Sequence, residues 1–178
     1  MNNTSQQYDT AIKLCQDLFL KKMKDYGTAW RNLRPTSLTD QIFIKAQRIK
    51  SIEEKGTQKV VDDIKGEYIG IINYCVISLI QLELFNDARL ELPYSEVETL
   101  YTKYVQQTKQ LMEDKNHDYG EAWRDMRMSS LTDLILMKIF RVKQIEDNKG
   151  ETLVSEGVDA NYMDMLNYAV FALIKLKS

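Results

Sequence analysis

The chain contains few of the residues that interrupt helices or form disulfides. Only two prolines and seven glycines occur among its 178 residues, and these are the residues that most often end helices and form turns. The two cysteines, Cys15 and Cys75, lie in apolar helical patterns and lack any CxxC or Cys/His spacing. We therefore expect long helices, with the cysteines as buried free thiols in a reducing compartment.

The chain also lacks a large excess of charge of either sign, and it lacks the common nucleotide-binding motifs. The net charge of −2 at pH 7 provides no basic field, so we expect no nucleic acid polymer as a partner, whereas a nucleotide or small phosphate ligand remains open. The motifs GxxxxGK, GxSxG and GxGxxG do not occur, which removes support for P-loop, hydrolase-elbow and Rossmann sites.

Targeting and membrane-spanning segments are not evident either. The first ten residues have no basic region followed by an apolar run, unlike a signal peptide. The most apolar stretch, residues 68–85, includes Asn73, Gln81 and Glu83, which favours a buried bundle helix over a membrane span. We expect a cytoplasmic protein with no membrane contact.

The most informative feature present is an internal repeat. Residues 25–53 and 118–146 align without a gap, and 17 of these 29 positions are identical. The similarity resumes at residues 71–82 and 165–176. Such a repeat usually means two copies of one structural unit. The shared residues are mostly polar, whereas a repeat kept only for packing would share apolar positions.

Apolar residues recur at spacings of three and four, which indicates helices throughout. We predict an all-α fold: two tandem three-helix repeats packed as a pseudo-symmetric helical bundle. Repeat 1 spans residues 1–85, a linker spans 86–95 and repeat 2 spans 96–178. We expect Ser37–Asp40 and Ser95–Glu98 to form capping boxes at two helix starts. The six expected helices cover residues 5–24, 37–55, 67–84, 96–117, 130–148 and 160–177.

Charged and amide side chains share faces of the second and third helices of each repeat. Carboxylates one turn apart can hold a hard divalent cation, and Lys and Arg can neutralise phosphate oxygens. Together they suit metal-assisted attack of water on a phosphoanhydride. The candidate ligands of Mg²⁺ or Mn²⁺ are Glu156, Asp164, Asp62 and Glu67. The candidate catalytic residues are Glu146 and Asp133, and the candidate substrate-binding residues are Lys138, Arg141, Asn167, Tyr168, Lys45 and Arg48.

Each of these residues also has a structural interpretation. Asp40 and Asp133 could act through helix capping and the helix dipole, and the acids of the second helices could form an ion network with neighbouring Lys and Arg. The Asn-Tyr pairs could be satisfied core groups that set helix register, and Trp30 and Trp123 are typical packing anchors. The single histidine, His117, aligns with a lysine in the other copy, which excludes a histidine-based mechanism common to both.

The order KxxDYGxAW, then K-x-x-R, then D-x-x-N-Y resembles the family called nucleotide modification associated domain 1. The resemblance covers nearly all of both copies and implies a link with nucleotide metabolism. In the second copy the matching residues are Lys115, Asp118, Tyr119, Gly120, Lys138, Arg141, Glu156, Asp164, Asn167 and Tyr168. In the first copy they are Lys22, Asp25, Tyr26, Gly27, Lys45, Arg48, Asp62, Asn73 and Tyr74.

Helix order and acid placement are also similar to the MazG-like all-α nucleoside triphosphate pyrophosphohydrolases. That similarity implies magnesium bound by an E-x-x-E pair on one helix and E-x-x-D on the next. The chain has no E-x-x-E at the needed position, and its E-x-x-D is split between Glu67 in the first copy and Asp164 in the second.

Two functional hypotheses follow. The first is a magnesium-dependent nucleotide-binding protein, for which nucleoside triphosphate pyrophosphohydrolysis is the candidate reaction if the protein is an enzyme. The second is a non-catalytic helical module for nucleotide sensing or oligomerisation, in which the acids are paired with Lys and Arg and no cleft is open. An exposed apolar face at Leu136, Met137 and Phe140 would favour a homodimer.

Overall fold

The computed structural model describes residues 3–56, 61–152 and 156–177, and of residues 61–63 it describes the helix but not the side chains. The described chain forms six α-helices and two short 3-10 helices without any strand, which confirms the all-α prediction. In chain order the elements are α1 (Thr4–Tyr26), η1 (Ala29–Asn32), α2 (Pro35–Lys55), α3 (Val61–Glu83), α4 (Tyr94–Tyr119), η3 (Ala122–Asp125), α5 (Met128–Asp147) and α6 (Val158–Lys177).

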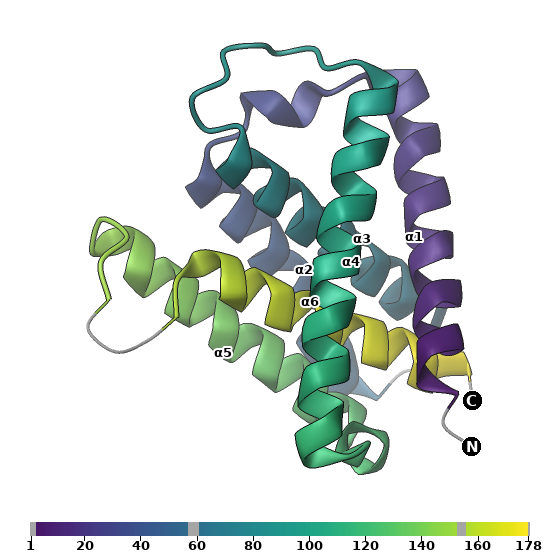
Figure 1. Cartoon of the computed structure of the whole chain (residues 1–178). Coiled ribbons are helices and arrows are strands. Elements are labelled where there is room, and N and C mark those ends of the chain that lie inside the picture. Colours follow the sequence, from purple (N-terminus) through teal and green to yellow (C-terminus); the bar gives the residue numbers. More distant parts are fainter. Residues whose placement is uncertain (1–2, 57–60, 153–155, 178) are drawn as a thin grey trace.

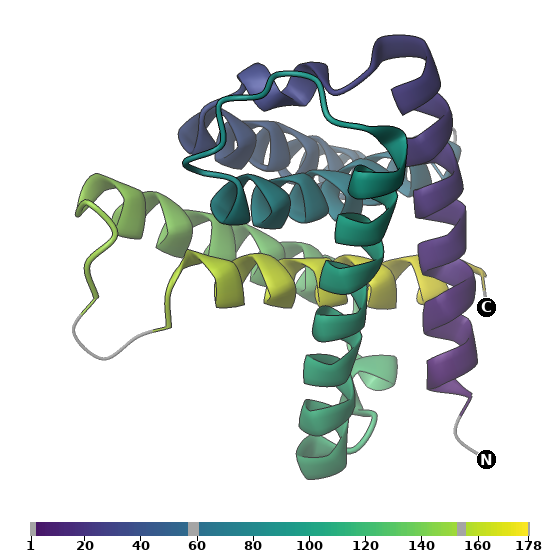
Figure 2. The same ribbon diagram turned by 45° about the horizontal axis from the view of Figure 1, so that its top comes forward.

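The helices pack as a bundle with two layers. Helices α2, α3, α5 and α6 form the first layer, in which α3 packs on α6, α2 on α3, α5 on α6, and α2 on α5. Helices α1 and α4 lie side by side and cross α6, as Figures 1 and 2 show. Each of these two helices contacts both α3 and α6, so the repeats interdigitate. Within the described ranges, no helix combines the length and the hydrophobicity that spanning a membrane requires.

Glycines and prolines determine where several helices end and begin. Helix α1 stops at Gly27, whose φ of +63° lies in the region that only glycine adopts readily. Helix α2 begins at Pro35, whose missing N–H is not needed in the first turn, and α4 begins directly after Pro93. The predicted capping boxes at Ser37 and Ser95 are wrong, because both residues lie inside their helices and neither helix has a side-chain cap.

Two buried asparagines connect the layers in a pseudo-symmetric way. In α6, Asn167 accepts a hydrogen bond from the Tyr8 hydroxyl at 2.7 Å and donates to the Thr108 carbonyl at 3.1 Å. In α3, Asn73 accepts from the Tyr101 hydroxyl at 2.7 Å and donates to the Cys15 carbonyl at 3.2 Å. Each amide therefore binds α1 and α4 together, one from its own repeat and one from the other.

A second pair of polar contacts joins α2 and α5 across the repeats. The hydroxyls of Thr39 and Tyr162 lie 2.7 Å apart, and Thr39 also donates to Glu146 Oε2 at 3.1 Å. The equivalent set is Tyr68 with Thr132 at 2.7 Å, and Thr132 with Glu53 Oε2 at 3.2 Å. Because these hydroxyls are buried, the contacts satisfy groups that would otherwise oppose folding.

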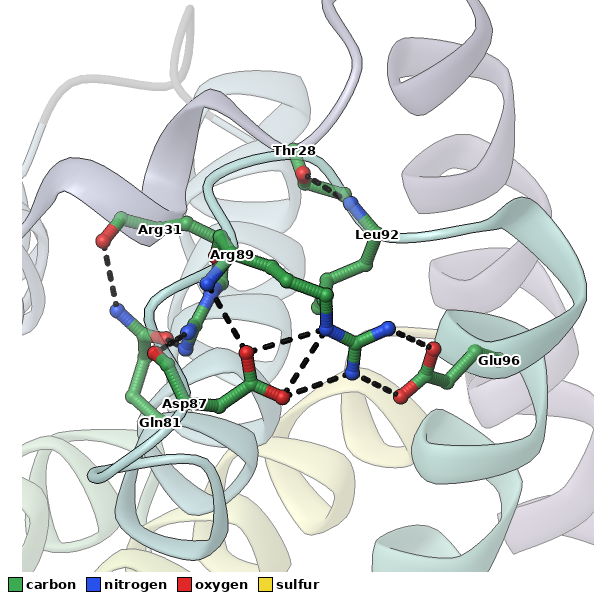
Figure 3. Close-up of polar contacts among 7 residues, drawn as sticks. All are labelled: Thr28, Arg31, Gln81, Asp87, Arg89, Leu92 and Glu96. Carbon is green, nitrogen blue, oxygen red and sulfur yellow. Dashed lines mark hydrogen bonds and ion pairs between the residues drawn. The ribbon is translucent and has the colours of Figure 1, made fainter.

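The linker between the repeats is tied to η1. Arg31 donates to the Arg89 carbonyl at 2.9 Å and to the Asp87 carbonyl at 2.6 Å, and Thr28 donates to the Leu90 carbonyl at 2.7 Å. Figure 3 shows the Arg89 guanidinium between the carboxylates of Asp87 and Glu96. The linker thus holds η1 and the end of α1 in place.

The apolar face expected on α5 is only partly exposed. Met137 and Phe140 are 38% and 52% exposed, but Leu136 is 6% exposed, so its predicted exposure is wrong. Leu136 is buried because it points toward the core cluster that α5 shares with its neighbours. The homodimer stays a prediction.

Replacing Tyr101 by Phe should lower the free energy of unfolding by about 1–3 kcal/mol, because the Asn73 carbonyl oxygen would be left buried without a donor. Tyr8→Phe should have a similar effect through Asn167. Urea denaturation measures both changes, with the exposed Tyr119→Phe as the control. An effect of Tyr101→Phe no larger than that of Tyr119→Phe would contradict the role given to the amide.

Candidate functional site

The second repeat contains a buried carboxylate between two lysines. Asp164 of α6 is 3% exposed, and its Oδ1 accepts a hydrogen bond from Lys115 Nζ of α4 at 2.7 Å. Lys138 Nζ of α5 lies 2.8 Å from Oδ2. That second contact has the distance of an ion pair but not the angles of a hydrogen bond, so Oδ2 has a cationic partner without a hydrogen bond. The two ammonium groups neutralise the carboxylate.

The electrostatics around Asp164 follow from this pairing. Burial of the Lys115 ammonium opposes its protonation, but the hydrogen bond and the charge of Asp164 outweigh this and raise the pKa of Lys115. Burial, and then the negative charge of Asp164, also raise the pKa of the nearby Tyr168 hydroxyl. Both lysine and tyrosine therefore stay protonated at neutral pH.

The first repeat has the same lysines without the carboxylate. Lys22 and Lys45 align with Lys115 and Lys138, but Gly70 stands where the second repeat has Asp164. A Cβ atom placed on Gly70 would lie 2.9 Å from Cδ and Cε of Lys45, so the lysine stem rests against the glycine. Among the described residues Lys22 makes no ion pair.

The acid of the first repeat stands one helical turn earlier. Glu67 Oε1 accepts from Arg48 at 2.7 Å, while Glu67 Oε2 lies 3.7 Å from Lys45 Nζ. Lys45 Nζ also lies 5.7 Å from the centre of the Tyr74 ring, within cation–π range. Arg48 thus forms a close ion pair with Glu67, whereas Lys45 lies farther from the Glu67 carboxylate and faces the Tyr74 ring.

A cavity of about 490 Å³ opens beside Gly70, and we call it the first-repeat pocket. Its volume lies in the range of pockets that hold small molecules. Its wall includes Lys22 and Lys45, together with Phe19 and Trp30, whose ring centres lie 6.4 Å apart. The lining residues are Leu18, Phe19, Lys22, Met23, Tyr26, Gly27, Ala29, Trp30, Leu33, Lys45, Gly66, Ile69, Gly70, Asn73, Tyr74 and Ile77.

The same region of the second repeat is filled by its own side chains. Phe171 stands at the position of Ile77, and the Trp123 ring stacks on it with centres 4.3 Å apart and planes 6° apart. Trp123 is 5% exposed, and the Arg124 guanidinium lies 4.4 Å from the centre of its ring. Two substitutions, Ile to Phe and Gly to Asp, thus occupy the space that the first repeat leaves open.

Some predicted site residues come together and others do not. Lys138, Asp164 and Tyr168 form one cluster, joined by Lys115. Glu156 is exposed, and its charge contributes to the raised pKa of Lys115. The second-helix lysine and the third-helix polar face therefore meet, as the sequence predicts.

The two candidate catalytic acids, Glu146 and Asp133, lie outside this cluster, and each interacts with a different residue of the other repeat. Glu146 accepts from Thr39 of the other repeat. Asp133 is exposed, and its charge acts on Glu53 of the other repeat. Asp133 and Arg141 line a hollow between α5 and α2, and the charge of Arg141 also acts on Tyr168 of the cluster. Both acids lie in the helix expected over residues 130–148, but the sequence did not show which helices α5 would pack against.

Asn167 and Asp62 have separate outcomes. Both ends of the Asn167 amide are used by Tyr8 and Thr108, which leaves it a core group rather than a group open to a ligand. The side chain of Asp62 lies outside the described part of the chain.

The described carboxylates do not fit a magnesium ion. Within the described ranges, no group of three Asp, Glu, His or Cys side chains lies close enough to share a metal. Asp164 is held by two lysines, and Glu67 is held by Arg48 and Lys45. Mg²⁺ prefers several oxygen ligands in octahedral geometry. Asp164 and Glu67, each held by two cations, therefore do not suit a magnesium ion.

The site residues predicted from the sequence did not include Lys22, Lys115, Gly70 or the aromatic residues that line the pocket. Both lysines begin the KxxDYG motif of their repeat, so the sequence did contain a sign of them. The significance of Gly70 depends on its contact with Lys45, which no sequence pattern reveals.

The geometry defines a class of protein: an all-α bundle of two interdigitated repeats, with an open lysine-and-aromatic pocket in one and a carboxylate-filled counterpart in the other. The model of the family nucleotide modification associated domain 1 matches residues 22–82 and 115–176. The chain belongs to this family and contains its domain in two copies. The family name associates it with nucleotide modification without a specific activity. The comparisons found no match among curated proteins or solved structures.

Replacing Lys138 by Met should lower the free energy of unfolding by roughly 1–3 kcal/mol, because the buried Asp164 would lose one of its two cations. Lys45→Met is the matched control in the first repeat and should cost less than about 1 kcal/mol, since Glu67 keeps Arg48. Chemical denaturation measures both. Equal losses would contradict the difference between the repeats.

Glu146→Gln should raise stability at pH 7. Burial, with smaller contributions from Asp40 and Asp147, raises the pKa of Glu146, while the bond from Thr39 opposes this. A raised acid pKa means that the folded state binds the proton more tightly, so stability falls as pH rises through the folded pKa. Glutamine keeps an acceptor for Thr39 without the charge.

The stabilisation by Glu146→Gln should shrink as pH drops from above the raised pKa of Glu146 to the usual glutamate range, and should be absent below that range. Glu53→Gln, at the equivalent position, should behave alike because burial raises that pKa too. Melting temperature as a function of pH checks both variants. A benefit that grows on acidification would contradict the sign.

Proposed function

We propose that this chain is a nucleotide-binding module whose ligand occupies the first-repeat pocket. The observation that carries the proposal is the combination, in one cavity, of two lysines and an aromatic wall. This combination suits a molecule with a planar ring at one end and negative charge at the other. The family's association with nucleotide modification points to the same class of ligand.

The two parts of the pocket would bind the two parts of a nucleotide. Stacking of a base on an aromatic side chain contributes about 1–3 kcal/mol, and Trp30 and Phe19 offer such surfaces. Lysine binds phosphate as a mobile point charge, and Lys22 and Lys45 stand on the same cavity. Tyr74 lines the same cavity, and its ring centre lies 5.7 Å from Lys45 Nζ.

The arrangement supports binding more than hydrolysis. Two described carboxylates approach residues of the pocket wall: Glu67, which accepts from Arg48, and Glu91, whose Oε2 lies 3.3 Å from the Thr28 amide nitrogen. An acid engaged in this way is not poised to activate water. The pairing of acids with Lys and Arg is what the non-catalytic hypothesis expects, whereas its expectation of no open cleft is wrong for the first repeat. Nucleotide sensing without turnover agrees with both facts.

Nucleotide binding predicts a stabilising shift in melting temperature with a nucleotide and none with free ribose. Lys22→Ala should weaken binding by at least about tenfold, and Trp30→Leu should do so as well because the stacking surface is lost. Lys21→Ala is the matched control, since Lys21 is exposed and does not line the pocket. Calorimetric titration gives the affinities. Unaltered affinity in Lys22→Ala, or no binding of any nucleotide, would refute the assignment.

A further inference from the structure

The two repeats place identical groups around one position that differs. Lys22 and Lys45 in the first repeat correspond to Lys115 and Lys138 in the second. Between the second pair lies the Asp164 carboxylate, with its oxygens 2.7 and 2.8 Å from the two nitrogens. Between the first pair there is a glycine and a cavity. The second repeat therefore displays what the lysine pair holds when an anion is present.

We propose that the ligand of the first-repeat pocket carries one phosphomonoester group, which takes the place between Lys22 and Lys45 that Asp164 takes in the second repeat. The ligand class is then a nucleoside monophosphate and not a triphosphate. This inference rests on the proposed function, nucleotide binding, for the presence of a base in the ligand. It adds the identity of the charged group that the lysines bind.

The two lysines offer positive charge to an anion. Lys22 is exposed and Lys45 is partly buried, and both line the first-repeat pocket. Lys22 has no ion-pair partner among the described residues, and Lys45 approaches Glu67 no closer than 3.7 Å. A phosphomonoester carries a charge of about −1.5 to −2 and three acceptor oxygens, which matches two ammonium groups better than a single carboxylate does.

Two carboxylates near the pocket disfavour a longer phosphate chain. Glu67 Oε2 lies 3.7 Å from Lys45 Nζ, and Glu67 Oε1 accepts from Arg48. Glu91 Oε2 lies 2.8 Å from the place where a Cβ on Gly27, a residue of the pocket wall, would stand. Further phosphates that approached either acid would be repelled, because like charges at short range repel.

The second repeat, in contrast, is occupied by its own side chain. Asp164 neutralises the lysines, and the stacked Trp123 and Phe171 fill the space where a ring would lie. The full chain should accordingly bind one ligand, in the first repeat.

Calorimetric titration at fixed ionic strength tests the charged group. The probes are the four common nucleosides, their 5′-monophosphates and 5′-triphosphates, and ribose 5-phosphate. We expect one monophosphate to bind with a stoichiometry of one and at least about tenfold more tightly than its nucleoside and its triphosphate. A triphosphate that binds more tightly than the monophosphate would overturn the single-phosphate inference while nucleotide binding stands. Ribose 5-phosphate binding as tightly as every nucleotide would instead uphold the phosphate site and overturn the proposed function.

Gly70→Asp tests the position directly, with Gly70→Asn as a control of the same size without charge. The new Cβ displaces the flexible end of Lys45 in both variants. The aspartate should raise the melting temperature above that of the Asn variant and weaken monophosphate binding at least about tenfold more, because it neutralises the lysines as Asp164 does. Equal affinity in the two variants would overturn the inference.

The reverse change, Asp164→Gly, leaves Lys115 and Lys138 without their carboxylate. Its melting temperature should fall and then recover with inorganic phosphate more than wild type does, relative to chloride of equal ionic strength. Recovery equal to that of wild type would show that this lysine geometry does not select phosphate, and would also overturn the inference.

Discussion

Two buried amides connect every layer of the molecule. Asn73 and Asn167 each accept a hydrogen bond from a tyrosine hydroxyl of the opposite repeat. Each also donates a hydrogen bond to a backbone carbonyl of its own repeat. A buried amide left unpaired opposes folding, so α1 and α4 must cross α3 and α6 in one register. That register places Lys22 and Phe19 of α1 above Gly70 of α3, and thereby creates the first-repeat pocket.

The two repeats share the same helical framework but differ in the side chains that fill the space between the helices. Both repeats keep the lysines, the tryptophan and the Asn-Tyr pair, yet one encloses a cavity and the other an ion cluster beside a stacked aromatic pair. Gly70 and Asp164 account for the electrostatic half of the difference, and Ile77 and Phe171 for the volume. A duplicated domain can thus keep one site open while the other strengthens the bundle.

The extent to which the sequence predicted the site differs from residue to residue. Asp164 and Lys138 were expected near each other, because 3.6-residue periodicity places them on inward faces of consecutive helices. Glu146 was expected beside them, but it contacts Thr39 of the other repeat, since α5 packs on α2 as well as on α6. Two of the four carboxylates proposed as metal ligands, Asp164 and Glu67, have lysine and arginine partners from other helices.

By itself, the sequence determined the helices, the duplication and the family, because helix periodicity and repeated motifs are local properties that survive without knowledge of packing. It also determined which polar residues share a face. Only the tertiary structure decided which faces meet, that Lys22 and Lys45 line one pocket, and that Gly70 leaves room where Asp164 leaves none. The physical reason is that an ion pair or a cavity depends on distances between helices, which are determined by the packing of all side chains at once.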